Sequence, residues 1–180
     1  MKKTTKTITL SGMFLALALL LPFLTGQIPQ IGAMLCPMHF PALLCGFFCG
    51  GPAGLLVGLL APLLRSLLFG MPPLFPKAIC MAVELGVYGF VAGFLYRRLP
   101  KRKSTVYLSL GIAMLLGRLC WGAAMFLCLG AEFGMAAFLS GAVTTALPGI
   151  LLQWLLLPVI VFSMEKQRNA SLSQKKQVGS

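Results

Sequence analysis

Long apolar runs dominate the chain, and short polar, glycine-rich or proline-rich segments separate them. A helix that crosses a bilayer needs about 20 mostly apolar residues. The predicted spans cover residues 8–25, 38–50, 53–69, 78–96, 106–129 and 136–164. The pattern therefore predicts an all-α integral membrane protein: a bundle of six transmembrane helices in one domain over residues 1–164, followed by a polar cytoplasmic tail over residues 165–180.

Prolines mark two further features of this pattern. Residues 71–76 contain three prolines, which remove backbone donors and clash with the preceding turn, so a loop is predicted there. Another loop is predicted around Gln27, Pro29 and Gln30, and it stays apolar as far as Pro37. The sixth predicted span carries Pro148 and Pro158 within it.

Composition supports the membrane assignment, because 58% of the residues are hydrophobic and only 10% are charged. The chain has 15 Lys and Arg but only 3 Asp and Glu, which in a soluble protein would suggest a nucleic-acid partner. Here the basic residues fall before the first span, between the fourth and fifth spans, and after the sixth, so no nucleic-acid partner is expected. By the positive-inside rule both termini of this multi-pass protein are predicted to be cytoplasmic. These basic residues are Lys2, Lys3, Lys6, Arg97, Arg98, Lys101, Arg102, Lys103, Lys166, Arg168, Lys175 and Lys176.

Three other basic residues, Arg65, Lys77 and Arg118, fall in the half of the bundle remote from the cytoplasm. A charge at membrane depth costs roughly 2.5 to 3.5 kcal/mol on insertion scales, so such residues tend to pair or to face an internal cavity. Glu84 is the candidate partner, and helical spacing puts it on one face with Lys77 and Tyr88. The pattern predicts a polar cavity that opens at the outer side.

Two neighbouring segments contribute to this predicted cavity. Thr145, Gly149 and Gln153 recur at four-residue steps in the sixth span, and Thr145 is predicted to line the cavity with the charged residues. His39, the only histidine, lies in the apolar loop that would form the rim or lid.

Each candidate also has a structural interpretation. Arg65 and Glu84 could form an ion pair between neighbouring helices, and Arg118 could extend to the outer interface. Lys77 could be an interfacial anchor, and His39 could serve in helix capping or loop packing rather than in a metal site, since it lacks further ligands.

Known catalytic patterns are absent from the sequence. It contains no G-x-x-x-x-G-K-[ST] phosphate loop, no H-E-x-x-H and no G-x-S-x-G. The six cysteines are scattered through apolar runs, where thiols usually pack as small core residues. The sequence therefore predicts no catalytic residues, no metal and no cofactor, and favours a transporter or a substrate-binding membrane subunit over an enzyme.

Several segments together resemble the S components of energy-coupling factor (ECF) vitamin transporters. The resemblance runs from about Lys6 to Met164. It is carried by the apolar loop into Met38-His39-Phe40-Pro41, the run 46–51 before Pro52, Ala61-Pro62-Leu63-Leu64-Arg65-Ser66, the Met71-Pro72-Pro73 loop and Pro148-Gly149-Ile150. It implies a six-helix subunit of a bacterial plasma membrane that captures a vitamin or related micronutrient at its outer side, and the cations in the predicted cavity suggest an anionic, pantothenate-like one.

The resemblance also implies partners: a transmembrane coupling (T) subunit and two ATPase (A) subunits that drive uptake. Small residues on the first helix would contact the coupling subunit, and Gly12 and Ala16 match that pattern best, with Ala18 nearby. Internal packing of the first span is the alternative use of these residues. A stand-alone secondary permease and a membrane-embedded enzyme are alternative functions, although neither has a positive feature in the sequence.

Overall fold

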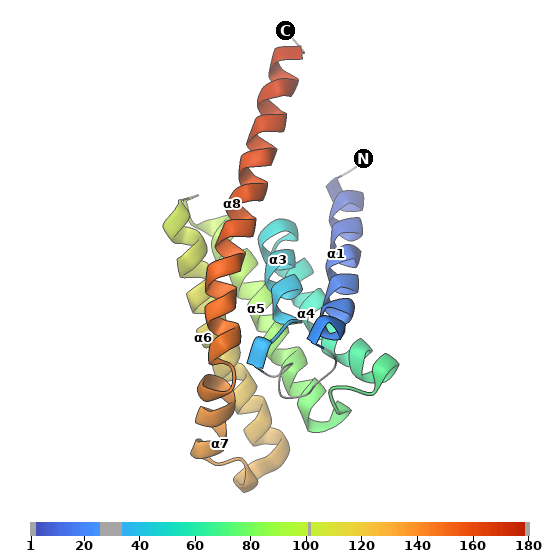
Figure 1. Ribbon diagram of the computed structural model, residues 1–180, viewed down its shortest axis with the longest axis vertical. Helices are drawn as coiled ribbons and strands as arrows, with labels where there is room; N and C mark the ends of the chain where they lie inside the picture. The colour runs from blue at the N-terminus through green and yellow to red at the C-terminus, as the bar shows by residue number, and fades with distance from the viewer. Residues whose placement is uncertain (1–2, 26–33, 101, 179–180) are drawn as a thin grey trace.

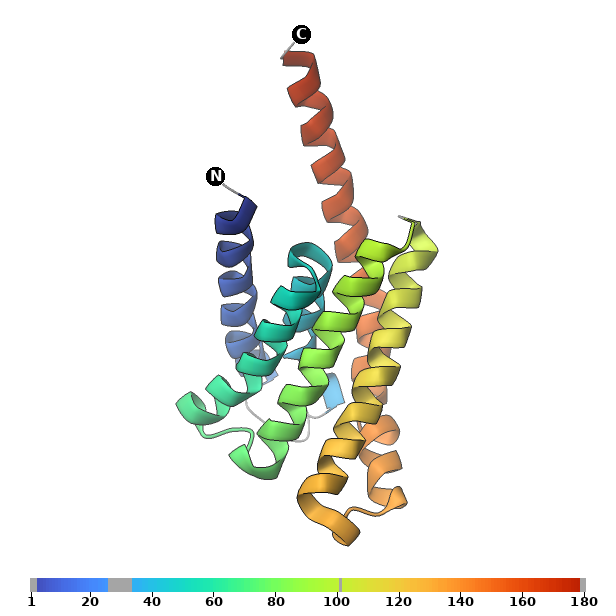
Figure 2. The same cartoon turned by 180° about the vertical axis from the view of Figure 1, so that it is seen from behind.

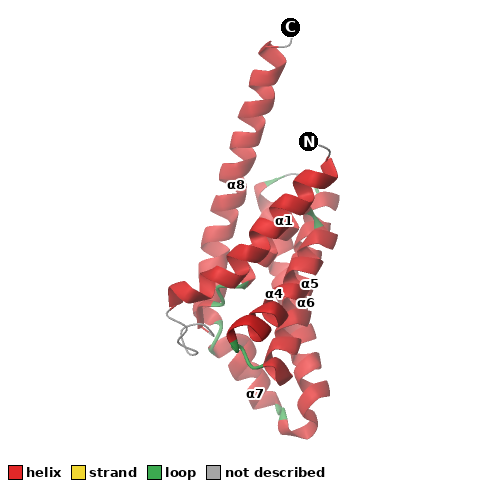
Figure 3. Ribbon diagram, turned by 90° about the vertical axis from the view of Figure 1, so that its right-hand side faces the viewer, coloured by secondary structure: helices red, strands yellow, loops and turns green. Residues whose placement is uncertain are grey.

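The computed structural model describes residues 3–25, 34–100 and 102–178, and helices account for most of them (Figures 1 and 3). Lys2, Lys101 and the predicted loop around Gln27, Pro29 and Gln30 lie outside the described residues. The α-helices are α1 (Lys3–Leu20), α3 (His39–Cys49), α4 (Gly51–Phe69), α5 (Ile79–Arg98), α6 (Lys103–Leu129), α7 (Met135–Leu139) and α8 (Leu147–Val178). Short 3-10 and π-type turns extend or join them: η1 (Leu21–Thr25), η2 (Leu74–Ala78), η3 (Gly130–Glu132) and η4 (Ser140–Thr144).

Five helical segments of the described chain are long and apolar enough to cross a membrane. They are Thr4–Leu24, Gly51–Phe69, Leu74–Arg98, Lys103–Leu129 and Leu147–Gln167. The second predicted span is the exception, because α3 has only 11 residues. At 1.5 Å per residue it is about 16 Å long, roughly half of a bilayer core. The all-helical, membrane-type fold is thus as predicted, whereas the count of six full spans is not confirmed.

The sixth predicted span, 136–164, is not one helix. Residues 135–144 form α7 and η4, Thr145 and Ala146 form a turn, and α8 begins at Leu147. Pro148 explains the break, because proline is tolerated in the first turn of a helix but disrupts a helix interior. In the other direction, α8 continues through the residues predicted as a polar tail and ends only at Val178.

The proline loop also differs in detail from the prediction. Residues 70–73 are non-helical, but the π-type turn η2 begins at Leu74, before the last of the three prolines. Phe75 within it has extended backbone angles (φ −114°, ψ 136°), as expected for a residue that precedes proline.

Both ends of the described chain lie at the same end of the bundle, together with the link between α5 and α6 (Figures 1 and 2). We call this the basic end, because Lys6, Arg97, Arg98 and Lys103 belong to it. The opposite, loop end carries η2, η3 and α7. The cytoplasmic orientation of the basic end stays a prediction from the positive-inside rule.

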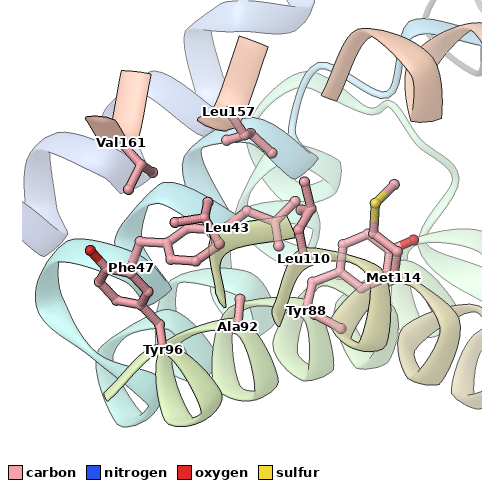
Figure 4. Packing of buried hydrophobic residues seen from close by; sticks show 11 residues of the cluster. Leu43, Phe47, Tyr88, Ala92, Tyr96, Leu110, Met114, Leu157 and Val161 are labelled. Atoms are coloured by element: carbon pink, nitrogen blue, oxygen red, sulfur yellow. The ribbon is translucent and has the colours of Figure 1, made fainter. Parts of the chain in front are cut away.

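Helix α5 is the centre of the bundle and packs against α3, α4 and α6. It approaches α4 very closely, because a Cβ at Gly54 or at Gly89 would overlap the backbone of the other helix. Small residues at a helix crossing permit this approach in a membrane protein. Toward the basic end, α3, α5, α6 and α8 enclose an apolar core (Figure 4), whose members include Leu43, Phe47, Tyr88, Ala92, Tyr96, Leu110, Met114, Leu157 and Val161.

Candidate functional site

A buried ion pair joins the two central helices. Arg118 Nη1 of α6 lies 3.1 Å from Glu84 Oε1 of α5, and only 2% of the Glu84 side chain is exposed. Gly117 makes this approach possible, because a Cβ at that position would overlap the Tyr88 ring and come within 3.1 Å of the Glu84 carbonyl. Taking both charges out of water is costly, so each depends strongly on the other.

His39 brings α3 to the same place. Its Nε2 lies 3.5 Å from Glu84 Oε1, and its ring meets the Tyr88 ring edge-on with centroids 5.3 Å apart. A turn in which the His39 amide donates to the Cys36 carbonyl (3.0 Å) sets this position. His39, Glu84, Tyr88 and Arg118 therefore form one group, which we call the polar cluster.

Cys36 lies at the edge of the polar cluster, where Arg118 Nη2 donates to its Sγ at 3.9 Å. Burial raises the pKa of the Cys36 thiol to about 11, so the thiol is uncharged at neutral pH. The carboxylate of Glu84 is therefore the anionic partner that the described residues provide for Arg118.

Much of the hydrogen-bonding capacity of the polar cluster is unused. Three of its buried atoms have no hydrogen-bond partner among the described residues: His39 Nδ1, the Tyr88 hydroxyl oxygen and Arg118 Nε. Glu84 Oε1 has its two ionic neighbours but likewise accepts no well-aligned hydrogen bond. Buried polar atoms are nearly always paired, so such a concentration of unpaired ones indicates a place where a ligand or water completes the bonds.

Arg65 is buried too, but it lies elsewhere. Its Nη1 donates to the carbonyl of Leu19 at 2.7 Å, and its guanidinium stacks near the rings of Phe23 (5.0 Å) and Phe69 (5.4 Å). Arg65 thus ties the end of α1 to the end of α4. In the described chain the basic side chains beside the Glu84 carboxylate are those of Arg118 (3.1 Å) and His39 (3.5 Å), not that of Arg65.

Two other predicted site residues lie in turns rather than in the long helices. Lys77 is exposed in η2 at the loop end. A π-type turn has more residues per turn than an α-helix, so the 3.6-residue period that aligned Lys77 with Glu84 does not extend across it. Thr145 is half-buried in the turn before α8, and its amide donates to the Ser140 carbonyl.

The face of α1 that was expected to contact a partner is open. Gly12 and Ala16 are exposed, and nothing described lies within 4 Å of a Cβ built at Gly12. Phe14 and Ala18, on the other side of the helix, are buried. Internal packing of α1 therefore uses Phe14 and Ala18 rather than Gly12 and Ala16.

Sequence reasoning did not include Gln153 in the site, although its spacing from Gly149 had placed it on an inward face. The Gln153 side chain in α8 is 1% exposed, and its Oε1 has no hydrogen-bond partner among the described residues. At the loop end there is also an apolar hollow of about 440 Å³, lined by Leu119, Gly122, Ala123, Phe126, Phe133, Gly134, Met135 and Phe138.

A bundle of membrane-type helices around a buried, incompletely paired polar cluster is the architecture of a solute-binding membrane subunit. The profile of the family described as "ECF transporter, substrate-specific component" matches residues 6–161. The chain belongs to this family, and it is a substrate-binding transport component of a multi-pass membrane type. The family is one of transport components, not of enzymes. No curated protein and no solved structure matches the chain.

Proposed function

We propose that this chain captures a small, vitamin-like solute from the outer side of a bacterial plasma membrane and delivers it to an ATP-driven importer. The solute occupies the polar cluster and completes the bonds that His39, Tyr88 and Arg118 leave open. The observation that supports this most strongly is the set of buried, unpaired polar atoms around the Glu84–Arg118 pair.

The chemistry of these side chains suggests a solute with at least one anionic group, such as a pantothenate-like acid. Arg118 keeps an unused N–H on Nε, and an arginine guanidinium can contact two anions because it carries several donors in one plane. Glu84 keeps Arg118 paired while the site is empty, and the bound anion then shares the guanidinium. Arg65 acts outside this contact, as the link that holds the ends of α1 and α4 together.

The energy for uptake comes from partners: a transmembrane coupling subunit and two ATPase subunits. The exposed Gly12–Ala16 face of α1 is the proposed contact with the coupling subunit, because small residues let two helices approach closely in a membrane. Gly12→Leu together with Ala16→Leu is expected to reduce co-purification with the coupling subunit at least tenfold and to leave solute binding unchanged. Leu17→Ala, at an exposed position on another side of α1, is the control and should leave co-purification unchanged.

Two measurements test the proposed function. The purified chain is titrated with thiamine, riboflavin, biotin, folate and pantothenate, and tight binding of one of them is expected. Proteoliposome uptake of that vitamin is then measured with and without the coupling and ATPase subunits and ATP. Uptake by the chain alone without ATP would support a stand-alone secondary permease instead, and failure to bind any of the five would contradict vitamin capture.

A further inference from the structure

Outside the polar cluster, Gln153 is the described residue with a buried side-chain polar atom that lacks a hydrogen-bond partner. It lies in the second turn of α8, its side chain is 1% exposed, and its carbonyl Oε1 accepts no hydrogen bond from the described residues. A buried carbonyl oxygen that accepts no hydrogen bond destabilises the folded protein, because it has lost its bonds to water without replacement. A leucine would fill similar space at no such cost, so the glutamine calls for a role other than packing.

The neighbours of Gln153 along α8 define the depth at which it lies. Gly149, one turn toward the loop end, packs against Met34 and Leu35, and these residues lead into Cys36 beside Arg118. Leu157, one turn toward the basic end, belongs to the apolar core. Residues four apart share a helix face, so Gln153 points inward between these two contacts.

The facing helices place the polar cluster at the same depth. Leu43 and Met114 belong to the apolar core with Leu157, and one turn further toward the loop end, α3 carries His39 and α6 carries Arg118. In Figure 4 the Tyr88 hydroxyl lies beside Met114, at the end of the core remote from Val161. Gln153 is one turn beyond Leu157 in the same direction, so it borders the region that the polar cluster surrounds.

We infer that Gln153 is a specificity-determining residue of this site, which accepts a hydrogen bond from a neutral donor of the solute, a hydroxyl or an amide N–H. This inference rests on the proposed function, and it narrows the substrate class. The solute carries an anionic group for Arg118 and, separately, a neutral hydrogen-bond donor for Gln153. A carboxylic acid with hydroxyl or amide groups has this combination, whereas an acid with an apolar remainder does not.

The inference predicts opposite effects of one substitution on stability and on binding. Gln153→Leu keeps about the same volume and removes the unpaired carbonyl oxygen, so the melting temperature of the empty protein is expected to stay the same or to rise. Binding of whichever of the five vitamins the wild-type chain binds is expected to weaken at least tenfold. A purely structural glutamine would give the reverse: a lower melting temperature and, per folded molecule, unchanged binding.

The second half of the test uses a changed probe. An analogue of the bound vitamin, methylated at its hydroxyl or amide donor, should bind the wild-type chain at least tenfold more weakly than the vitamin itself. Gln153→Leu should not distinguish the two compounds, and Gln153→Glu, which keeps an acceptor, should still prefer the unmethylated one. Leu155→Ala on the exposed side of α8 is the control and should behave as wild type.

The outcomes separate this inference from the proposed function. If the wild-type chain binds none of the five vitamins, the proposed function fails and this inference fails with it. If the wild-type chain binds one of them and Gln153→Leu binds it equally well, or still rejects the methylated analogue tenfold, only the role of Gln153 is overturned.

Discussion

Two buried arginines of this protein differ in how completely their own chain satisfies them. Arg65 has a backbone carbonyl at 2.7 Å and two aromatic rings near its guanidinium. Arg118 has one carboxylate and one neutral thiol, and its Nε is left without a partner. Sequence position alone treats the two as equivalent, since both lie in the outer half of an apolar helix. Burial alone shows only that a charged side chain is costly to place. A buried arginine that still has an unpaired N–H donor also indicates where a solute can bind.

The largest expected effect concerns Arg118. Arg118→Met removes the contact for an anionic group and takes the guanidinium from the buried Glu84 carboxylate, whose remaining polar neighbour is His39 Nε2 at 3.5 Å; this costs about 3 to 5 kcal/mol of stability. Vitamin binding is expected to fall at least a hundredfold, measured by calorimetric titration of the purified chain. Combining it with Glu84→Gln should restore the melting temperature without restoring binding. Normal binding by Arg118→Met would show that Arg118 is as structural as Arg65.

A smaller loss of binding is expected from Gly117→Ala. The added Cβ overlaps the Tyr88 ring, which must move and carry the polar cluster with it. We expect binding of the same vitamin to weaken about tenfold, a difference of about 1.4 kcal/mol. Gly12→Ala is the matched control, because its Cβ meets nothing described within 4 Å, and it should bind as wild type. Equal affinities of the two variants would mean that the α5–α6 approach at Gly117 is not needed for the site.

Arg65→Met tests whether the other buried arginine is purely structural. It leaves the Leu19 carbonyl without its charged donor, and hydrogen bonds to charged groups contribute about 1.5 to 3 kcal/mol. The melting temperature should fall accordingly, while vitamin affinity per folded molecule should remain within about twofold of wild type. Arg65→Lys should recover only part of the stability, because an ammonium cannot reproduce the planar stacking on Phe23 and Phe69. A large loss of affinity would instead bring Arg65 into the solute site.

The smallest effect on binding is expected from joining α5 and α6 at the loop end. Cys80 and Cys128 have sulfur atoms 3.8 Å apart, and both thiols are free. Oxidation by copper phenanthroline and oxygen should form one disulfide, seen as the loss of two titratable thiols that Cys128→Ser prevents. Vitamin binding should change less than about twofold, since the polar cluster lies deeper between the same helices. Failure to form this bond would contradict the packing of α5 on α6 at the loop end.

The sequence predicted those features that depend on one helix at a time. Runs of apolar residues, the proline positions and the basic links located most helices, and the segments quoted for the ECF resemblance agree with the family match. The short extent of α3 was predicted (38–50, against His39–Cys49 in the structure), but the count of full spans could not be, because a short apolar segment is compatible either with a span or with a helix that ends within the bundle. The break before Pro148 was missed because a proline inside an apolar run is compatible with either a kink or a new helix.

The candidate site required knowledge of which helices face one another. Helical spacing correctly placed Glu84 and Tyr88 on a common buried face, since this depends on α5 alone. The partner of Glu84 depends on how α3 and α6 pack against α5, so His39 and Arg118 could be proposed as neighbours but not distinguished from Arg65. Gln153 shows the same limit. Its spacing along the sequence indicated that the side chain points inward, but the sequence could not show that its Oε1 lacks a hydrogen-bond partner.

The uninterrupted course of α8 has a mechanical consequence. Its 32 residues make a rod about 48 Å long at 1.5 Å per residue, which exceeds the roughly 30 Å thickness of a hydrocarbon core. Leu157 and Val161 pack into the apolar core and hold the first half of α8 in the bundle. The second half of α8 projects from the basic end (Figure 1). If α8 pivots by ten degrees at Val161, its end at Val178, about 26 Å away, moves by about 4 Å. A small tilt of the packed part of α8 therefore produces a larger displacement at Val178.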